Sequence, residues 1–465
     1  MSWEETTPGV FRHEYGKVEQ VYRNISTLFL PLHKEHWVIH CVVTLHDLRN
    51  NFAETLRKAW RLLRFEYPDI GIVPDGLTHK TYSPVNDEPA LEEWVNQTFF
   101  IQSQGTANEI SAAAKPNVFP TLHYFPATRE VLFLSSHWRI DGVGTLIVLN
   151  RLFSLVAGDG DASNILPLGT DLSSKLAPCL EDALDAATEY TEEMKTYARE
   201  SIAEFHKKAV QKASFPYNGD LKTPPARSLH ETLRFSAAST SRIVAACKQH
   251  QISVTSAVHA ALAEVYFAYG GAADESDYTT ATSVNMRNYL PASFDTNPAA
   301  HPFQPYVTSI TPTVRRASSF ADRTVALTKD YTNWYNDEFR KCLRLIYQYH
   351  AEALTTRPAP GAPPRAPPSG LSVSSLGRVE KLLETEFGGG IVKLKDFHFG
   401  VSMLTRQILL YVWTFEGGLT LSLNYNDAYY QQETVRDVLR RMREALETGL
   451  GLELELETEL ETELV

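Results

Sequence analysis

The residues with the clearest chemical potential are six in a row at positions 137–142, His-Trp-Arg-Ile-Asp-Gly. A neutral imidazole can take a proton from a substrate hydroxyl or amine, because its reference pKa lies near ~6.5. Asp141 is four residues further on, where it either faces the substrate or turns away and anchors the loop. In a chain with 15 histidines this spacing arises by chance, so the spacing alone is a weak signal.

The flanking sequence predicts how this hexapeptide is held. The apolar run at 131–134 is typical of a buried strand, and the apolar stretch at 146–153 favours a helix. The predicted order is therefore strand, tight turn and helix, with His137 at the end of the strand. Gly142 would let the backbone turn tightly after Asp141.

Composition sets the wider frame. A chain of 465 residues is too long for one ordinary core and predicts two or three domains. The net charge of −12 argues against a nucleic-acid surface and against an anionic membrane surface. The N-terminus is polar and acidic, and no apolar run approaches the ~20 residues of a membrane span, so we expect a cytoplasmic protein. The cysteines have no pairing or zinc spacing, which favours a reducing compartment: Cys41, Cys179, Cys247 and Cys342.

The pattern of elements predicts a mixed α/β chain in two halves. We expect an N-terminal domain at 1–213, a linker at 214–230, a C-terminal domain at 231–448 and an acidic tail at 449–465. The tail alternates Leu and Glu, which indicates disorder or a loosely attached edge strand. Predicted elements of the first half are strands at 28–32 and 36–45, a helix at 52–65, a hairpin of 121–125 with 130–134, and one long helix or a helix pair at 180–212.

The second half has its own predicted series. It comprises strands at 231–235, 278–286, 371–375, 391–394, 407–415 and 420–425, helices at 239–250, 255–269 and 433–447, and an exposed proline-rich loop at 357–370.

Metal and nucleotide sites are not expected. The spacing of His33, His36 and His40 would place the last two on one face of a helix, but the segment is strand-like, where they lie too far apart for one ion. Phosphate-binding glycine motifs are absent, so no cofactor is predicted to be bound.

Four segments in order resemble the HxxxD acyltransferase superfamily, which includes chloramphenicol acetyltransferase, plant BAHD acyltransferases, peptide-synthetase condensation domains and fungal trichothecene acetyltransferases. These segments are His137 to Gly142 (HxxxDG), the stretch 283–291 with Arg287, the stretch 374–377, and Asp-Phe-His-Phe-Gly at 396–400. Two departures are Ser136, where many relatives have a second histidine, and Phe399, where the pattern has tryptophan. The overall look is closest to the fungal branch.

The resemblance implies an α/β (α+β) fold of two chloramphenicol-acetyltransferase-like domains, each a mixed sheet flanked by helices, with a tunnel between them. The catalytic group would be His137, Asp141 and Gly142, with His137 alone acting as general base and no covalent intermediate. Structural support would come from an Asp141–Arg287 ion pair and from Asp396 and Gly400, with His398 an ordinary packed or surface residue.

Two further assignments complete the predicted site. Ser374 or Ser375 would contact the substrate or the oxyanion, although a polar residue on a strand is the simpler interpretation of each. The N–H of Gly142 is a second candidate donor to the oxyanion.

The implied activity is transfer of an acyl group, acetyl in the simplest case, from acyl-CoA to a hydroxyl of an apolar small-molecule natural product in fungal secondary metabolism. Acyl-CoA would be a co-substrate, and the protein a monomer. One alternative is a stand-alone condensation-like enzyme that takes its acyl group from an acyl carrier protein to form an ester or amide. Another is a non-catalytic binding module of the same fold.

Overall fold

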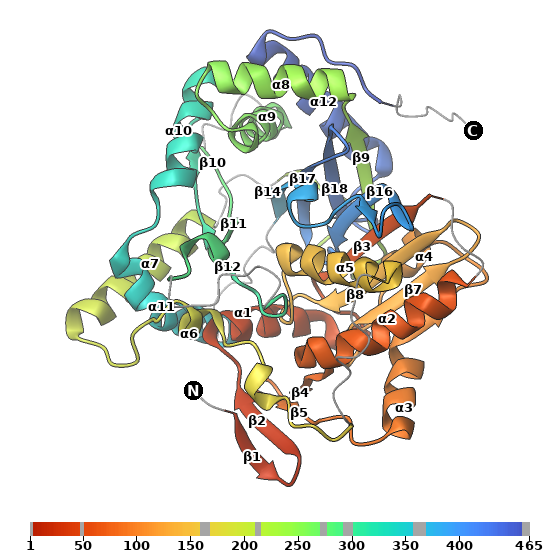
Figure 1. The fold of residues 1–465 in the computed structure, drawn as a ribbon. Coiled ribbons are helices and arrows are strands. Elements are labelled where there is room, and N and C mark those ends of the chain that lie inside the picture. The colour runs from red at the N-terminus through yellow and green to blue at the C-terminus, as the bar shows by residue number, and fades with distance from the viewer. Residues whose placement is uncertain are drawn as a thin grey trace.

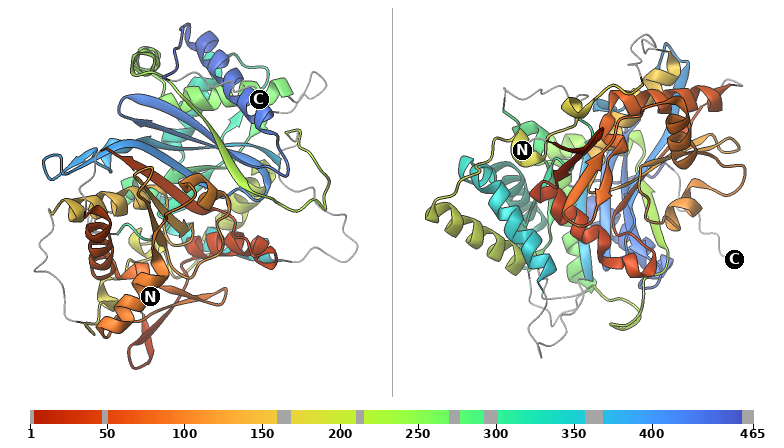
Figure 2. Two further views of the ribbon diagram at one scale, coloured as in Figure 1. Left: turned by 90° about the vertical axis from the view of Figure 1, so that its right-hand side faces the viewer. Right: turned by 90° about the horizontal axis from the view of Figure 1, so that it is seen from below.

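The computed structural model describes residues 3–46, 51–158, 168–209, 215–269, 277–291, 301–356 and 369–457. Two large β-sheets lie side by side at its centre, and helices cover their outer faces (Figures 1 and 2). The proline-rich segment 357–368 and the last residues of the acidic tail, 458–465, lie outside the described ranges.

The first sheet has six strands and draws on both halves of the sequence. Its order is β15 (Glu386–Phe387), β16 (Val392–Val401), β3 (Val38–Leu45), β8 (Glu130–Ser136), β7 (Thr121–Phe125) and β6 (Phe99–Ile101). The blue strand β16, from the second half, pairs antiparallel with the red strand β3 of the first half (Figure 1). The predicted hairpin is confirmed as β7 and β8.

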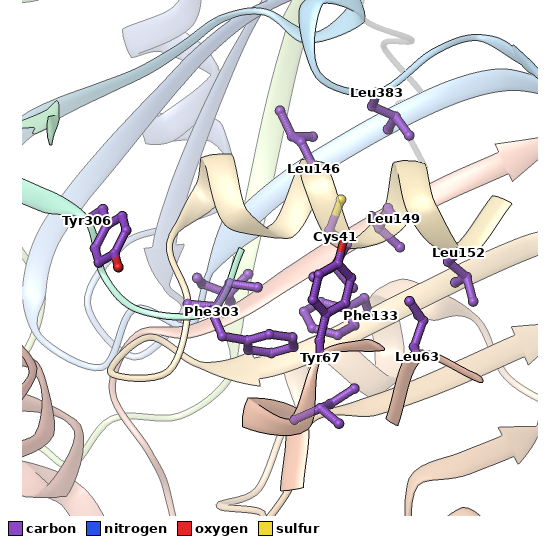
Figure 3. Packing of buried hydrophobic residues seen from close by; sticks show 14 of the residues in the cluster. Cys41, Leu63, Tyr67, Phe133, Leu146, Leu149, Leu152, Phe303, Tyr306 and Leu383 are labelled. Atoms are coloured by element: carbon purple, nitrogen blue, oxygen red, sulfur yellow. The ribbon is translucent and has the colours of Figure 1, made fainter. Parts of the chain in front are cut away.

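The helices of the first half are α1 (Lys17–Ser26), η1 (Thr27–Leu32), α2 (Phe52–Glu66), η2 (Pro68–Gly71), α3 (Glu88–Thr98), α4 (Ala107–Ala112), α5 (Gly142–Ala157), η4 (Ser173–Lys175), α6 (Leu180–Ala183) and α7 (Glu192–Ala209). Of these, α2, α3, α4 and α5 contact strands of the six-stranded sheet, whereas α7 packs against α11 (Asp337–Thr355). In the core beside α5, Leu149 and Leu152 lie with Phe133 of β8 and Leu63 of α2 (Figure 3). A small separate sheet comprises β1 (Glu4–Thr7), β2 (Val10–Glu14), β5 (His79–Tyr82) and β4 (Val73–Asp75).

The second large sheet has four strands, in the order β14 (Ser369–Arg378), β17 (Arg406–Phe415), β18 (Gly418–Asn426) and β9 (Ser228–Arg234). Strands β14 and β17 run parallel, and the other pairs are antiparallel. The helices of this half are α8 (Ala237–Gln249), α9 (Val254–Tyr269), η5 (Met286–Tyr289), α10 (Phe320–Asn333), α11 (Asp337–Thr355), η6 (Val379–Lys381) and α12 (Gln432–Leu450). Two short strand pairs complete it: β10 (Tyr278–Thr279) with β13 (Thr313–Val314), and β11 (Thr282–Asn285) with β12 (Val307–Ile310).

Strand β17 separates the two hydrophobic cores. Successive side chains of a strand point to opposite faces, so one strand can serve two cores. Leu410 and Val412 belong to the core of the second half, and Tyr411 and Trp413 to the core shared with the first half. The two halves are therefore joined through a strand that is buried on both faces.

Some predicted elements differ from the structure. Residues 28–32 were predicted as a strand and form part of the 3-10 helix η1, with Pro31 inside it and Leu28 and Leu32 exposed. Of the two alternatives at 180–212, the helix pair is confirmed, as α6 and α7, within the described residues up to 209. Near the C-terminus Leu456 bridges to Phe235 beside β9, so this described part of the tail lies at the edge of the second large sheet. Within the described ranges, no helix is both long and apolar enough to cross a membrane.

Candidate active site

His137 directly follows β8, and α5 begins five residues later at Gly142, as the sequence predicted. Asp141 is the N-cap of α5, and its Oδ1 accepts a hydrogen bond from the N–H of Gly144 at 2.7 Å. Such a cap satisfies one of the free N–H groups in the first turn of a helix. The carboxylate of Asp141 is thus committed to the helix and not to the imidazole.

The imidazole of His137 is held between aromatic rings. It stacks on Tyr22 of α1 with ring centroids 4.5 Å apart, and Trp37 lies tilted at 6.1 Å. Nδ1 is buried without a hydrogen-bond partner among the described residues. Burial lowers the pKa of His137, while its own backbone and the charge of Asp141 act in the opposite direction. The neutral, proton-accepting form therefore prevails at neutral pH.

The predicted ion pair between Asp141 and Arg287 is present. Nη1 of Arg287 lies 3.0 Å from Oδ1 and 2.8 Å from Oδ2 of Asp141. The Asp141 side chain is 2% exposed and that of Arg287 is 11% exposed. Arg287 also lies over the ring of Tyr306. A buried, paired carboxylate of this kind fixes the loop, because removing its partner would leave an uncompensated charge.

Gly142 is required by space and not by backbone conformation. We predicted a tight turn there, but Gly142 is the first residue of α5 and is absent from the residues with positive φ. A β-carbon at this position would lie 2.6 Å from Cδ2 of Leu376 and 3.3 Å from Cζ of Phe399. At Gly144 a β-carbon would lie 1.9 Å from the carbonyl oxygen of Pro302. Both glycines therefore let neighbouring segments approach the turn closely.

His137 lies in the wall of a cavity of about 290 Å³ between the two halves. Of the other predicted site residues, Ser374 also lines this cavity, together with Ser372 two positions earlier on the same face of β14. Ser375 points elsewhere and accepts a hydrogen bond from Thr255 at 3.1 Å. Of the two candidate serines, only Ser374 therefore lines the cavity.

The other residues that line the cavity are mostly apolar, and the sequence alone did not predict them as site residues. The aromatic members of the wall come from five elements or their edges: Tyr22, Trp37, Phe205, Phe339, Tyr347 and Tyr411. The backbone of Trp37 has a φ of 62°, which is unusual for a bulky residue. Such backbone outliers often mark functional sites. A second histidine, His350 of α11, also lines the cavity, and burial lowers its pKa to about 4.

The segment 396–400 supports the site from behind. Phe399 packs against Gly142, as described, and crosses the ring of Tyr411 edge-on at 5.0 Å. Asp396 is exposed and forms an ion pair with Arg234 at 3.2 Å. A β-carbon on Gly400 would lie 2.2 Å from Oδ1 of Asn424, so this glycine allows β16 to approach β18.

A second, larger cavity of about 810 Å³ adjoins the first and shares four lining residues with it: Ser201, Phe205, Ser309 and Phe339. Its rim carries the cations Lys208, Arg315 and Lys329 and the carboxylates Glu204, Asp277 and Asp330. Lys208 pairs with Glu204 at 3.3 Å. Within the described residues neither Arg315 nor Lys329 has an ion pair. Two cations are therefore available to an anionic ligand at this mouth.

Comparisons with known proteins identify relatives that match nearly the whole chain. No protein-family model matches the chain. The chain is 43% identical over 457 residues to the O-acetyltransferase pigM of Monascus ruber, a match that covers 97% of this chain and 88% of that protein. It is 39% identical over 450 residues to the azaphilone biosynthesis cluster protein M of Aspergillus terreus, with 96% and 97% covered.

Among solved structures, the fold is similar to that of the TRI3 trichothecene 15-O-acetyltransferase from Fusarium sporotrichioides, with a TM-score of 0.79 at 18% sequence identity. This likeness covers 96% of the present chain and 98% of that one. At this identity the likeness shows a common fold, which is the two-domain architecture with mixed sheets that the sequence predicted.

Proposed function

Because this chain belongs to the family of fungal O-acetyltransferases within the HxxxD acyltransferase superfamily, we propose that it transfers an acetyl group from acetyl-CoA to a hydroxyl of an apolar secondary metabolite. The observation that carries the proposal is the position of His137. Its imidazole lies in the wall of an aromatic cavity, while Asp141 is turned away onto Arg287.

In the proposed reaction, Nε2 of His137 takes the proton of the acceptor hydroxyl as its oxygen attacks the thioester carbonyl. A tetrahedral oxyanion forms and then collapses, breaking the C–S bond. The CoA thiolate leaves and recovers the proton from the imidazolium, so the histidine ends neutral and no bond to the enzyme forms. Depression of the pKa of His137 by burial supports this role, since it keeps the base unprotonated at neutral pH.

The hydroxyl of Ser374 is the better placed of the predicted oxyanion donors. It lines the cavity that contains His137, whereas Ser375 is engaged with Thr255 and Gly142 does not line the cavity. A donor already in position stabilises charge that develops in the transition state without a reorganisation cost.

An apolar, ring-containing acceptor suits the cavity. Aromatic side chains form much of its wall, and stacked or edge-on rings gain dispersion and quadrupole interactions. The similarity to a protein named for an azaphilone biosynthesis cluster supports a secondary metabolite of that class as the acceptor.

The second cavity is the proposed entrance for the acyl donor. The unpaired cations Arg315 and Lys329 suit the phosphates of CoA. Its rim also carries three carboxylates, Glu204, Asp277 and Asp330, so it offers a few cations for phosphates and no extended basic patch for an acidic carrier protein. This balance favours acyl-CoA over the condensation-like alternative. Charge reversal at Lys329 should raise the KM for acetyl-CoA and leave the KM for the acceptor unchanged.

The proposal is tested by incubating the protein with a panel of acyl-CoAs and candidate alcohols and detecting esters by mass spectrometry. A parallel series offers the acyl group on a pantetheinylated carrier protein. His137→Ala should fold and lose on the order of 10²–10⁴ in rate. The matched control is His350→Ala, which removes another histidine of the same cavity. An equal loss of kcat in both variants would contradict the assignment of His137 as the base, and acceptor binding without turnover by the wild type would favour a binding module.

A further inference from the structure

Three histidines from three strands meet where the two large sheets adjoin. They are His40 of β3, His398 of β16 and His230 of β9. One nitrogen of each can be chosen so that all three lie within 4.8 Å of one another. The rings of His230 and His398 stack with centroids 3.8 Å apart, and His40 lies 5.8 Å from His398 and 6.1 Å from His230.

Three nitrogens of this histidine cluster are buried without a protein partner among the described residues. His40 is 4% exposed, and both its Nδ1 and its Nε2 are buried without a hydrogen bond among the described residues. Nε2 of His398 is buried and unpaired in the same way. A buried polar group without a partner destabilises the folded protein, so an arrangement with three such nitrogens calls for an explanation.

The local backbone makes room for the cluster. In the β3–β16 ladder His40 is opposite Gly400, and a β-carbon on Gly400 would lie 2.4 Å from Nε2 of His40. The group contains histidines alone, with no carboxylate among its members. Three imidazoles without a carboxylate form a nitrogen-only ligand set, which is one that zinc accepts in proteins.

We propose that His40, His230 and His398 bind a divalent transition-metal ion of the Zn²⁺ class. Zinc–nitrogen bonds of about 2.0–2.1 Å place tetrahedral ligand atoms about 3.4 Å apart, so the observed cluster must close by roughly 1.4 Å at most. Because the lone pair of an imidazole nitrogen lies in the plane of the ring, the stacked rings must also turn toward the ion, by rotation about their side-chain bonds. His230 and His398 are partly exposed, which gives an ion a path from solvent and leaves a coordination position for water.

The site would join the two sheets, because β3 and β16 belong to the first and β9 to the second. It is separate from the chemistry, since none of the three histidines lines the cavity of His137. The same strand β16 contributes Val401 to that cavity and Met403 follows it there, so a bound ion would also restrain part of the cavity wall.

The test uses full-length, tag-free protein treated with a chelator and then titrated with Zn²⁺ by calorimetry, and with Co²⁺ by absorption. One equivalent should bind, and Zn²⁺ should raise the Tm. His230→Gln and His398→Gln should each weaken binding by at least the roughly 10- to 100-fold that loss of an outer partner of a metal ligand costs.

Two controls make the outcome specific. His123→Gln removes a buried histidine that already has partners in Gln102 and Thr121, and it should leave Zn²⁺ affinity unchanged. His137→Ala should also leave it unchanged, which separates this site from the catalytic one. Equal Zn²⁺ affinity in the wild type, His230→Gln and His398→Gln would overturn the proposal, as would the absence of stoichiometric binding by the wild type. Neither result depends on acyl transfer.

Discussion

Phe399 lies directly against Gly142, with Cζ of its ring 3.3 Å from the place where a β-carbon on Gly142 would stand. Cδ2 of Leu376 in β14 lies 2.6 Å from the same β-carbon position. The turn that aims His137 is therefore packed by the strand of the Asp-Phe-His-Phe-Gly segment and by the strand that carries Ser374. Motifs that are far apart in the sequence act here through one contact.

Gly142→Ala should overpack this contact. The new methyl group would meet Leu376, and overpacking of a well-filled site costs about 1–3 kcal/mol. Unfolding in urea and acyl-transfer rate should both report the loss. Gly142→Ala combined with Leu376→Ala should be more stable than the sum of the two single changes predicts, because the second change removes the clashing group. Strictly additive effects would argue against the contact.

The turn could be predicted from sequence because its signals are local. An apolar strand, a capping Asp141 and an apolar helix all fall within thirty residues, and β8 and α5 form as expected. The Asp141–Arg287 pair was inferred through family resemblance, since no local rule joins residues so distant. The division of the chain at 214–230 stays a prediction.

Elements that depend on distant partners could not be predicted. Residues 28–32 have the composition of a strand but no neighbouring strand to pair with, and they form the 3-10 helix η1. Likewise, nothing local shows that β16 joins the sheet of the first half. The pairing of β16 with β3 brings His398 close to His40, and β9 adds His230. Because these three histidines are far apart in the sequence, the local spacing of His33, His36 and His40 could not predict the cluster.

The Asp141–Arg287 pair should be strongly coupled. Asp141→Asn keeps an N-cap for α5, because Asn is also a good capping residue, but it leaves the buried guanidinium uncompensated at a cost of about 3–5 kcal/mol. Arg287→Met should cost a similar amount. The double variant should be destabilised by clearly less than the sum, and a double-mutant cycle from urea unfolding measures the difference. A coupling energy near zero would contradict the pairing.

The pH profile should report the lowered pKa of His137. The neutral imidazole is the active form, so kcat/KM should fall as the pH drops through the folded-state pKa, which burial places below the ordinary value of about 6.5. Activity should thus remain above half-maximal at pH 6.5. In Asp141→Asn the acid limb should move to still lower pH, because the charge of Asp141 raises the pKa of His137. An acid limb centred above pH 6.5 would be inconsistent with a buried neutral base.

Ser374 and Ser375 form a matched pair for testing the oxyanion site, because they are neighbours on β14 with opposite surroundings. Ser374 lines the cavity beside His137, and Ser375 bonds to Thr255. If Ser374 donates to the oxyanion, Ser374→Ala should lower kcat on the order of 10²-fold, the usual effect of losing one such donor. Ser375→Ala should change stability slightly and kcat little, since it removes one hydrogen bond outside the cavity.

KM for both substrates should stay nearly constant in Ser374→Ala, because the oxyanion exists only after attack. A comparable fall of kcat in both variants would point instead to a distorted β14, and a rise of KM alone would make Ser374 a substrate-binding residue.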